Sequence, residues 1–101
     1  MSIVKIPFWP FFKEPLLSGA KTCTARTKRL GAGGDRFMVF NQWFDLKSVT
    51  EEPLHFVADL WQQEGCTSRE HFIEIWESIH PGKGYDPEQL VFLHRFKLVK
   101  P

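Results

Sequence analysis

Cysteine is scarce in this sequence, and the residue types that usually bind zinc are scattered. The two cysteines, Cys23 and Cys66, do not form a C-x-x-C pair, and all four histidines lie singly in the second half of the chain. Structural zinc sites instead place cysteine and histidine ligands at short, regular spacings. The pattern therefore predicts no metal site, and we expect no cofactor.

Long hydrophobic runs are also lacking. No apolar stretch approaches the roughly 20 residues that span a bilayer, and the N-terminus has no basic region followed by a long apolar segment. We therefore expect a cytoplasmic protein with reduced thiols and no membrane partner.

There is little net charge, +1, but the charges are unevenly distributed. Residues 45–78 are dominated by acids, whereas residues 20–36 hold five basic residues and a single acid, Asp35. The basic residues of that segment are Lys21, Arg26, Lys28, Arg29 and Arg36. Two interpretations remain open, a phosphate-binding segment and a solvated turn.

Aromatic residues are abundant, with ten Phe and four Trp among 101 residues. A chain of this length forms one domain with a modest core. We therefore expect a single domain over residues 1–101 with an unusually aromatic interior.

Local patterns predict alternating strands and helices. Strands are expected at 3–8, 21–26, 36–40, 43–49 and 90–99, and helices at 11–19, at 53–63 and after a capping box formed by Thr67 and Glu70. This order favours an α+β fold, a small barrel of about five to six strands with two to three flanking helices. The apolar periodicity predicts mostly buried positions at Trp61, Phe72, Trp76, Ile79, Phe92 and Phe96.

Two separated motifs resemble the signatures of a known family. The first, in residues 16–37, is a helix followed by Gly-x-Lys-Thr-x-Thr-x-Arg and a later Gly-Asp; the second, in residues 64–81, begins with Glu-Gly and ends with Ile-His-Pro. Together with the strand at 91–99 they resemble ASCH domains, which are PUA-like barrels, over nearly the whole chain. The motif positions are Gly19, Lys21, Thr22, Thr24, Arg26, Gly34, Asp35, Glu64, Gly65, Phe72, Trp76, Ile79, His80 and Pro81. At Cys66 relatives tend to carry an aromatic residue, which we interpret as a core variation.

The resemblance implies a link to RNA or modified nucleosides. Some bacterial ASCH proteins are metal-independent amidohydrolases that remove the acetyl group from N4-acetylcytidine with a lysine, a threonine and a glutamate. By motif, these catalytic roles fall on Lys21, Thr24 and Glu64. The substrate would then be a small nucleoside, and we expect a monomer or weak dimer.

The residues fit that chemistry in physical terms. A threonine hydroxyl needs a nearby base to act as a nucleophile, and a neutral lysine is such a base. Because Lys21 and Thr24 would face opposite sides of an ideal strand, Lys21 is expected at an irregular strand start, with its side chain turned back toward Thr24. Glu64 is expected to hold the lysine or to protonate the leaving nitrogen.

Residues near these three are assigned to substrate binding or to the core. Arg26 suits a carbonyl, a phosphate or a structural ion pair, and we assign it to substrate binding. Phe8, also assigned to substrate binding, and Trp9 suit either base stacking or core packing. Cys23 is expected in the core, where a thiol is inert. Two alternatives to the amidohydrolase remain, an RNA-binding ASCH module without catalysis and a ribonuclease.

Overall fold

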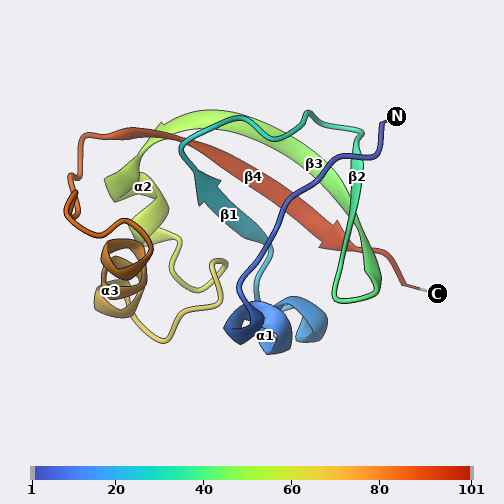
Figure 1. The fold of residues 1–101 in the computed structure, drawn as a ribbon, viewed down its shortest axis with the longest axis horizontal. Coiled ribbons are helices and arrows are strands. Elements are labelled where there is room, and N and C mark those ends of the chain that lie inside the picture. Colours follow the sequence, from blue (N-terminus) through green and yellow to red (C-terminus); the bar gives the residue numbers. More distant parts are fainter. Residues whose placement is uncertain (1, 101) are drawn as a thin grey trace.

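The computed structural model describes residues 2–100 and contains one curled antiparallel sheet with helices gathered around it (Figure 1). The sheet order is β1-β4-β3-β2. Its strands are β1 (Cys23–Arg26), β2 (Arg36–Val39), β3 (Gln42–Pro53) and β4 (Leu90–Leu98). A 3-10 turn, Pro10–Phe12, precedes α1 (Lys13–Ser18), and the later helices are α2 (Leu54–Asp59) and α3 (Arg69–Ile79). The expected α+β class is confirmed.

Two local features shape the sheet. Phe40 and Asn41 both have positive φ, 51° and 64°, which is the two-residue turn whose twist suits the β2–β3 hairpin. Farther along β3, the pairing with β4 shifts between Leu46 and Ser48, so Lys47 forms a bulge. A bulge increases strand bending, and here it helps the long β3 to curl into a half-barrel.

The expected number of strands is wrong, because the structure has four within residues 2–100. The segment 3–8 is not a strand. Ile3 forms only an isolated bridge with Arg36, and Val4 donates one backbone hydrogen bond to the Arg36 carbonyl. Pro7 lacks an N–H with which to continue a ladder, and Phe8 turns into the core instead.

Two expected helix boundaries also differ. The cap of α3 is Ser68, whose hydroxyl accepts from the His71 N–H at 3.0 Å, and not Thr67. The Thr67 N–H donates to His71 Nδ1. The side chain that accepts from the backbone at the helix start is therefore that of His71, and not that of Glu70 as the capping box predicts. The helix expected over 53–63 ends at Asp59, because the chain must turn so that the Gln63 carbonyl can accept from the start of β1.

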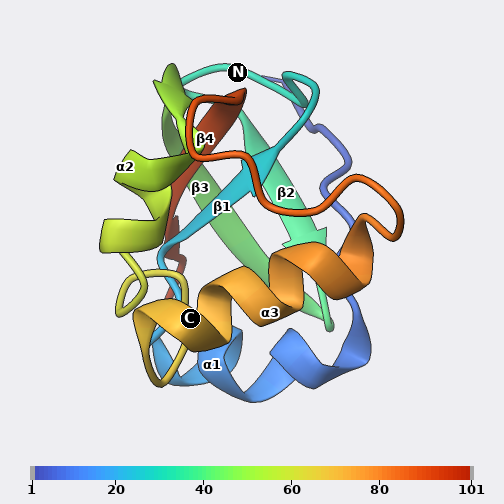
Figure 2. The ribbon, with the colours of Figure 1, turned by 90° about the vertical axis from the view of Figure 1, so that its left-hand side faces the viewer.

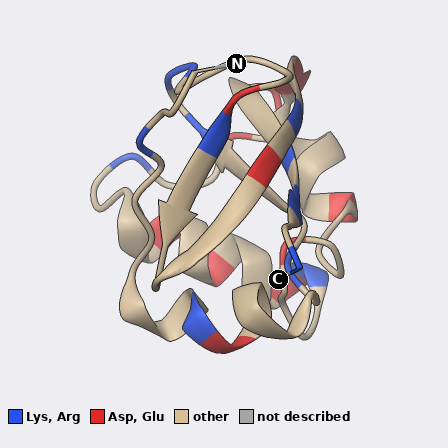
Figure 3. Cartoon of the chain, turned by 90° about the vertical axis from the view of Figure 1, so that its right-hand side faces the viewer, with Lys and Arg blue, Asp and Glu red and all other residues tan. Residues whose placement is uncertain are grey.

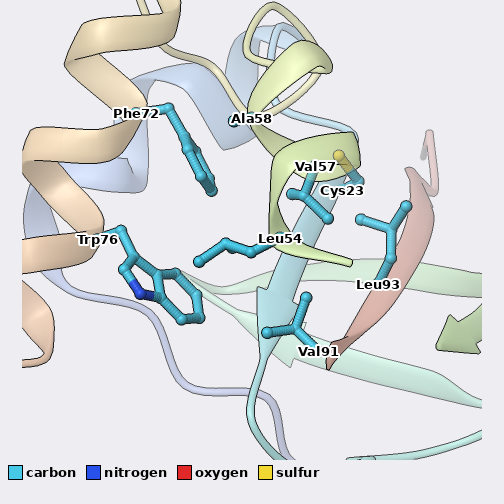
Figure 4. Packing of buried hydrophobic residues seen from close by; sticks show 8 residues of the cluster. All are labelled: Cys23, Leu54, Val57, Ala58, Phe72, Trp76, Val91 and Leu93. Carbon is cyan, nitrogen blue, oxygen red and sulfur yellow. The ribbon is translucent and has the colours of Figure 1, made fainter. Parts of the chain in front are cut away.

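The core has two clusters, which meet along β4. The first, drawn in Figure 4, packs α2 and α3 on one face of the sheet and comprises Cys23, Leu54, Val57, Ala58, Phe72, Trp76, Val91 and Leu93. The second lies inside the curl and comprises Ile6, Leu16, Phe37, Phe44, Leu46 and Phe96. Phe37 stacks on Phe44 with ring centroids 5.2 Å apart, and the edge of Phe96 meets both rings. The aromatic interior is thus concentrated in the second cluster.

Burial agrees with prediction at Phe72, Trp76 and Phe96. Trp61, Ile79 and Phe92 are mostly but not fully buried, which also agrees with the prediction. Each lies at a margin: Trp61 packs at the edge of the first cluster, Ile79 lines a cavity, and Phe92 lies under the Arg29 guanidinium. Among residues 2–100, no helix is long and apolar enough to cross a bilayer.

Candidate active site

A cavity of about 390 Å³ lies between the N-terminal segment, β1 with its following loop, and α3. Figure 2 shows α3 crossing in front of the sheet with α1 beneath it. The cavity wall includes all five predicted site residues: Phe8, Lys21, Thr24, Arg26 and Glu64. Its size is within the usual range for small-molecule sites.

Lys21 occupies the irregular start of β1. It forms an isolated bridge with Glu64, and its N–H donates to the Pro15 carbonyl at 2.9 Å, while regular pairing begins only at Cys23. The close approach depends on Gly65, whose φ is +80° and where a Cβ would lie 3.0 Å from the Cβ atoms of Lys21 and Pro15. The local backbone therefore places the lysine stem inside the protein.

The Lys21 ammonium makes a buried ion pair. Lys21 is 2% exposed and Glu64 is 4% exposed. Nζ donates to Glu64 Oε1 at 2.8 Å and to the Glu64 carbonyl at 3.0 Å, and it lies 4.6 Å from the Phe12 ring centroid. The other carboxylate oxygen, Oε2, accepts from the Cys23 thiol at 3.7 Å. Such a pair is stable in a dry site only when its remaining polar atoms are also satisfied, as they are here.

Thr24 faces the cavity from the middle of β1 and is buried. Its hydroxyl oxygen accepts from Arg26 Nε at 3.2 Å. We expected the Lys21 side chain to turn toward Thr24, but the two side chains have separate partners. The Lys21 ammonium donates to Glu64, and the Thr24 hydroxyl accepts from Arg26.

Arg26 is held in place without a carboxylate partner among the described residues. Its Nη2 donates to the Pro7 carbonyl, and its guanidinium lies 4.8 Å from the Phe8 ring centroid. Burial lowers the pKa of Arg26. The guanidinium keeps further N–H donors, which suits it to a carbonyl oxygen or an anion in the cavity.

Phe8 packs against the second core cluster and also lines the cavity. Core packing and a position suited to base stacking are therefore compatible at this residue. Its edge meets Phe12 and Phe96 at 6.1 Å between ring centroids. Trp9 also lines the cavity but is 50% exposed, which places it at the mouth.

The basic segment 20–36 is not a single phosphate-binding surface. Arg36 pairs with Asp45 at 2.9 Å, and Arg29 donates to the carbonyls of Gly31 and Val49. Lys21 and Arg26 point inward, which leaves Lys28 exposed at the cavity rim. Figure 3 shows basic and acidic positions interspersed on the face that it displays.

Both thiols are poor nucleophiles in this environment. Cys23 is buried, and burial strongly raises the pKa of its thiol. Burial raises the pKa of Cys66 to about 11. Cys66 packs against the first core cluster and also lines the cavity, so this position shapes the site as well as the core.

His94 supports Thr24 from the neighbouring strand, because the two residues are paired in register. Its Nδ1 lies 2.9 Å from the Phe92 carbonyl and must donate, since a carbonyl only accepts. Its Nε2 then accepts from the Leu30 N–H at 3.0 Å. These two bonds hold His94 as one neutral tautomer, and burial lowers its pKa.

This arrangement predicts a loss of stability in acid. At pH values below about 6.5 the unfolded chain protonates this histidine while the folded protein does not, so the free energy of unfolding falls as pH decreases toward the lowered folded pKa. His94 contributes at most about 1.4 kcal/mol per pH unit in that window. NMR titration of the ring, with urea unfolding at each pH, measures both effects. A His94 ring that titrates at pH 6.5 or above in the folded protein contradicts the assignment.

Sequence reasoning assigned no site role to several cavity residues, among them Phe12, Ile75 and His80. For His80, the sequence did contain a pattern that could have indicated its position. His80 continues the four-residue spacing of Phe72 and Trp76 on α3, so it lies on the same face of the helix.

Comparisons with known proteins identify the fold. No protein-family model matches the sequence, and no curated protein matches it. Among solved structures, an ASCH domain from Lactobacillus crispatus JV V101 superposes with TM-score 0.67 at 15% identity, covering 96% of this chain and 78% of that chain. A point mutant of ZmASCH from Zymomonas mobilis gives TM-score 0.60 at 20% identity, covering 98% and 73%. A hypothetical protein, PH0355, gives TM-score 0.71 at 13% identity, covering 98% and 100%.

The sheet, the helices at its end and the cavity between them define a small α+β half-barrel domain with a mostly apolar cavity that contains a buried ion pair. This chain has the fold of ASCH domains, as the motifs predicted.

Proposed function

We propose that this protein is a metal-independent amidohydrolase that removes the acyl group from N4-acylated cytosine nucleosides, converting N4-acetylcytidine to cytidine and acetate. The observation that supports this best is the buried Lys21–Glu64 pair in a cavity that also contains the Thr24 hydroxyl. Burying two charges is costly, and a fold that needed only a filled core would be served as well by apolar side chains.

Thr24 is the nucleophile in this mechanism. A proton first passes from Lys21 Nζ to Glu64 Oε1 across their 2.8 Å hydrogen bond, which leaves a neutral amine. That amine then moves from the Glu64 carbonyl into reach of Thr24 and takes the hydroxyl proton as Oγ1 attacks the acyl carbon. Arg26 stabilises the charge that develops on Oγ1 through Nε, which already donates to this atom.

Glu64 completes the first half of the reaction. Its carboxyl group returns the proton to the exocyclic N4 atom as the C–N4 bond breaks, so cytidine leaves and the charged pair is restored. The acyl group remains on Oγ1 as an ester. In the second half, the same proton transfer within the pair lets Lys21 deprotonate a water molecule, which attacks the ester. Oγ1 then recovers a proton from Glu64, and the acid product leaves as acetic acid, which ionises to acetate in solution.

The aromatic wall gives the pyrimidine ring a place to lie. Phe8 and Phe12 come from the N-terminal segment and Trp76 from α3, and all three line the cavity. Planar rings between aromatic side chains gain stacking energy and exclude water from the reacting bond.

The direct test is to incubate purified protein with N4-acetylcytidine after exhaustive dialysis against EDTA. We expect cytidine and acetate in equal amounts, with no loss of rate on chelation. The Thr24→Val variant is the matched control for a contaminating hydrolase. Absence of product from folded protein, or a strict requirement for added zinc, contradicts the proposal.

A second candidate is an RNA-binding module without catalysis, and the observation that favours it is the exposed pair of Trp9 and Phe11. Their rings meet edge to face at 5.7 Å and each is about half exposed, and Trp9 lines the same cavity as Lys28. Exposed aromatic rings near a cation suit stacking on unpaired bases. Tight binding of single-stranded RNA by protein that does not hydrolyse N4-acetylcytidine favours this candidate, and cleavage of that RNA indicates a ribonuclease.

A further inference from the structure

His80 lies on the cavity wall and has no part in the mechanism above. It caps the C-terminus of α3, and its ring lies on the Trp76 ring with centroids 4.1 Å apart. Its Nδ1 is 2.9 Å from the Trp76 carbonyl oxygen. Because that oxygen can only accept, Nδ1 carries the hydrogen.

This contact determines what the other nitrogen can do. In the neutral imidazole with Nδ1 protonated, Nε2 is an acceptor. It lies on the ring edge away from the helix backbone, and within residues 2–100 it has no hydrogen-bond partner. His80 therefore presents a fixed, unused acceptor on a wall that is otherwise mostly apolar at this end, with Ile75, Trp76 and Ile79 as its neighbours.

The position of His80 along α3 decides which part of a substrate it meets. Glu64 and Cys66 precede α3 at one end of the cavity, whereas His80 follows the last helical residue at the other. From Phe72 to His80 the helix rises about 12 Å. In a cytosine nucleoside N4 and the sugar are attached at opposite ends of the ring, so an acyl group beside the Lys21–Glu64 pair directs the sugar toward His80.

We propose that His80 is a specificity-determining residue that accepts a hydrogen bond from a sugar hydroxyl, so that the site recognises the nucleoside and not only the acylated base. This inference rests on the proposed function for the orientation of the ligand. The hydrogen bond itself needs only a hydroxyl donor near the C-terminal end of α3. A free acylated cytosine base has no such hydroxyl.

The experiment measures binding of the reaction product, so it does not depend on turnover. Dissociation constants are determined by calorimetry for cytidine and for its 2′-deoxy, 3′-deoxy and 5′-deoxy analogues at pH 8, with wild type and His80→Phe. Phenylalanine keeps a ring on Trp76 and removes the acceptor. His55→Phe is the matched control, because His55 lies on α2 and does not line the cavity.

We expect His80→Phe to bind cytidine roughly five- to tenfold more weakly, the effect of one neutral hydrogen bond. We also expect one deoxy analogue to bind wild type and His80→Phe equally, which identifies the hydroxyl, and His55→Phe to bind all four ligands as wild type does. Equal weakening for all four ligands, no weakening, or no binding of cytidine to wild type overturns the proposal.

A measurement on wild type covers the case in which His80→Phe fails to fold. The ¹⁵N spectrum of the histidine rings should show His80 with Nδ1 protonated, and its Nε2 resonance should shift on adding cytidine but not the discriminating analogue. A resonance that ignores cytidine overturns the inference. Failure of the proposed function is distinguished by the hydrolysis assay: absent hydrolysis with hydroxyl-dependent binding contradicts the reaction and leaves the His80 contact standing.

Discussion

We expect Thr24→Val to lower kcat for the proposed hydrolysis of N4-acetylcytidine by at least about 10²-fold, because the variant keeps the shape of the side chain and removes the oxygen proposed to attack. Thr24→Ser is the matched control, since it keeps a hydroxyl in the same hydrogen bond with Arg26, and we expect it to retain kcat within about tenfold of wild type. Initial rates of acetate release under saturating substrate measure both variants. Near-native kcat in folded Thr24→Val excludes Thr24 as the nucleophile.

The base is tested by a separate substitution. Lys21→Arg keeps the positive charge beside Glu64, but a guanidinium does not deprotonate, so kcat should also fall by at least about 10²-fold. Because the two residues act in one step, the Lys21→Ala, Thr24→Ala double variant should be little worse than either single variant. If Lys21→Arg folds normally and keeps near-native kcat, Lys21 is a positioning residue and the general-base mechanism is wrong.

Removing one member of the buried pair has the largest expected effect on stability. Lys21→Met leaves the Glu64 carboxylate without its cation in a site where the two side chains are only 1% and 5% exposed. Breaking such a pair typically costs about 3–5 kcal/mol. The free energy of unfolding, from urea denaturation followed by circular dichroism, should fall by that amount.

Replacing both members should recover most of the loss. In Lys21→Met, Glu64→Leu neither charge is buried, and apolar replacement of an ion pair is often neutral or stabilising. Arg36→Met is the matched surface control: its pair with Asp45 is 34% and 36% exposed, and it should cost about 1 kcal/mol or less. A double variant as unstable as Lys21→Met contradicts the view that the pair is kept for function at the expense of stability.

Several elements of the fold could be predicted because their signals are local. The stripe of Phe72 and Trp76 stops before Pro81 and predicts α3, and the alternating residues of 90–99 predict β4. These patterns follow from the helical and strand periods, which depend only on neighbours in the chain. The irregular position of Lys21 follows from the same reasoning. In a regular strand the side chains of Lys21 and Thr24 would lie on opposite faces of the sheet, so a shared site requires an irregular strand start.

Other features depend on which distant segments meet. The segment 3–8 reads as a strand on its own residues, yet it meets only the edge of β2 at Ile3 and then turns inward at Phe8. Residue type favours Ser68 over Thr67 only slightly, since both side chains can cap a helix. The choice depended on how α3 leaves the turn that follows α2.

For the site, the sequence by itself pointed to three candidate residues: a lysine and a threonine in one motif and a glutamate in another. Only the tertiary structure decided how they are arranged. Lys21 and Glu64 are 43 residues apart, and no local period encodes their 2.8 Å contact. That contact exists because Gly65 lets two backbones approach closely, and because a buried ammonium must find an anion once the fold has removed it from water.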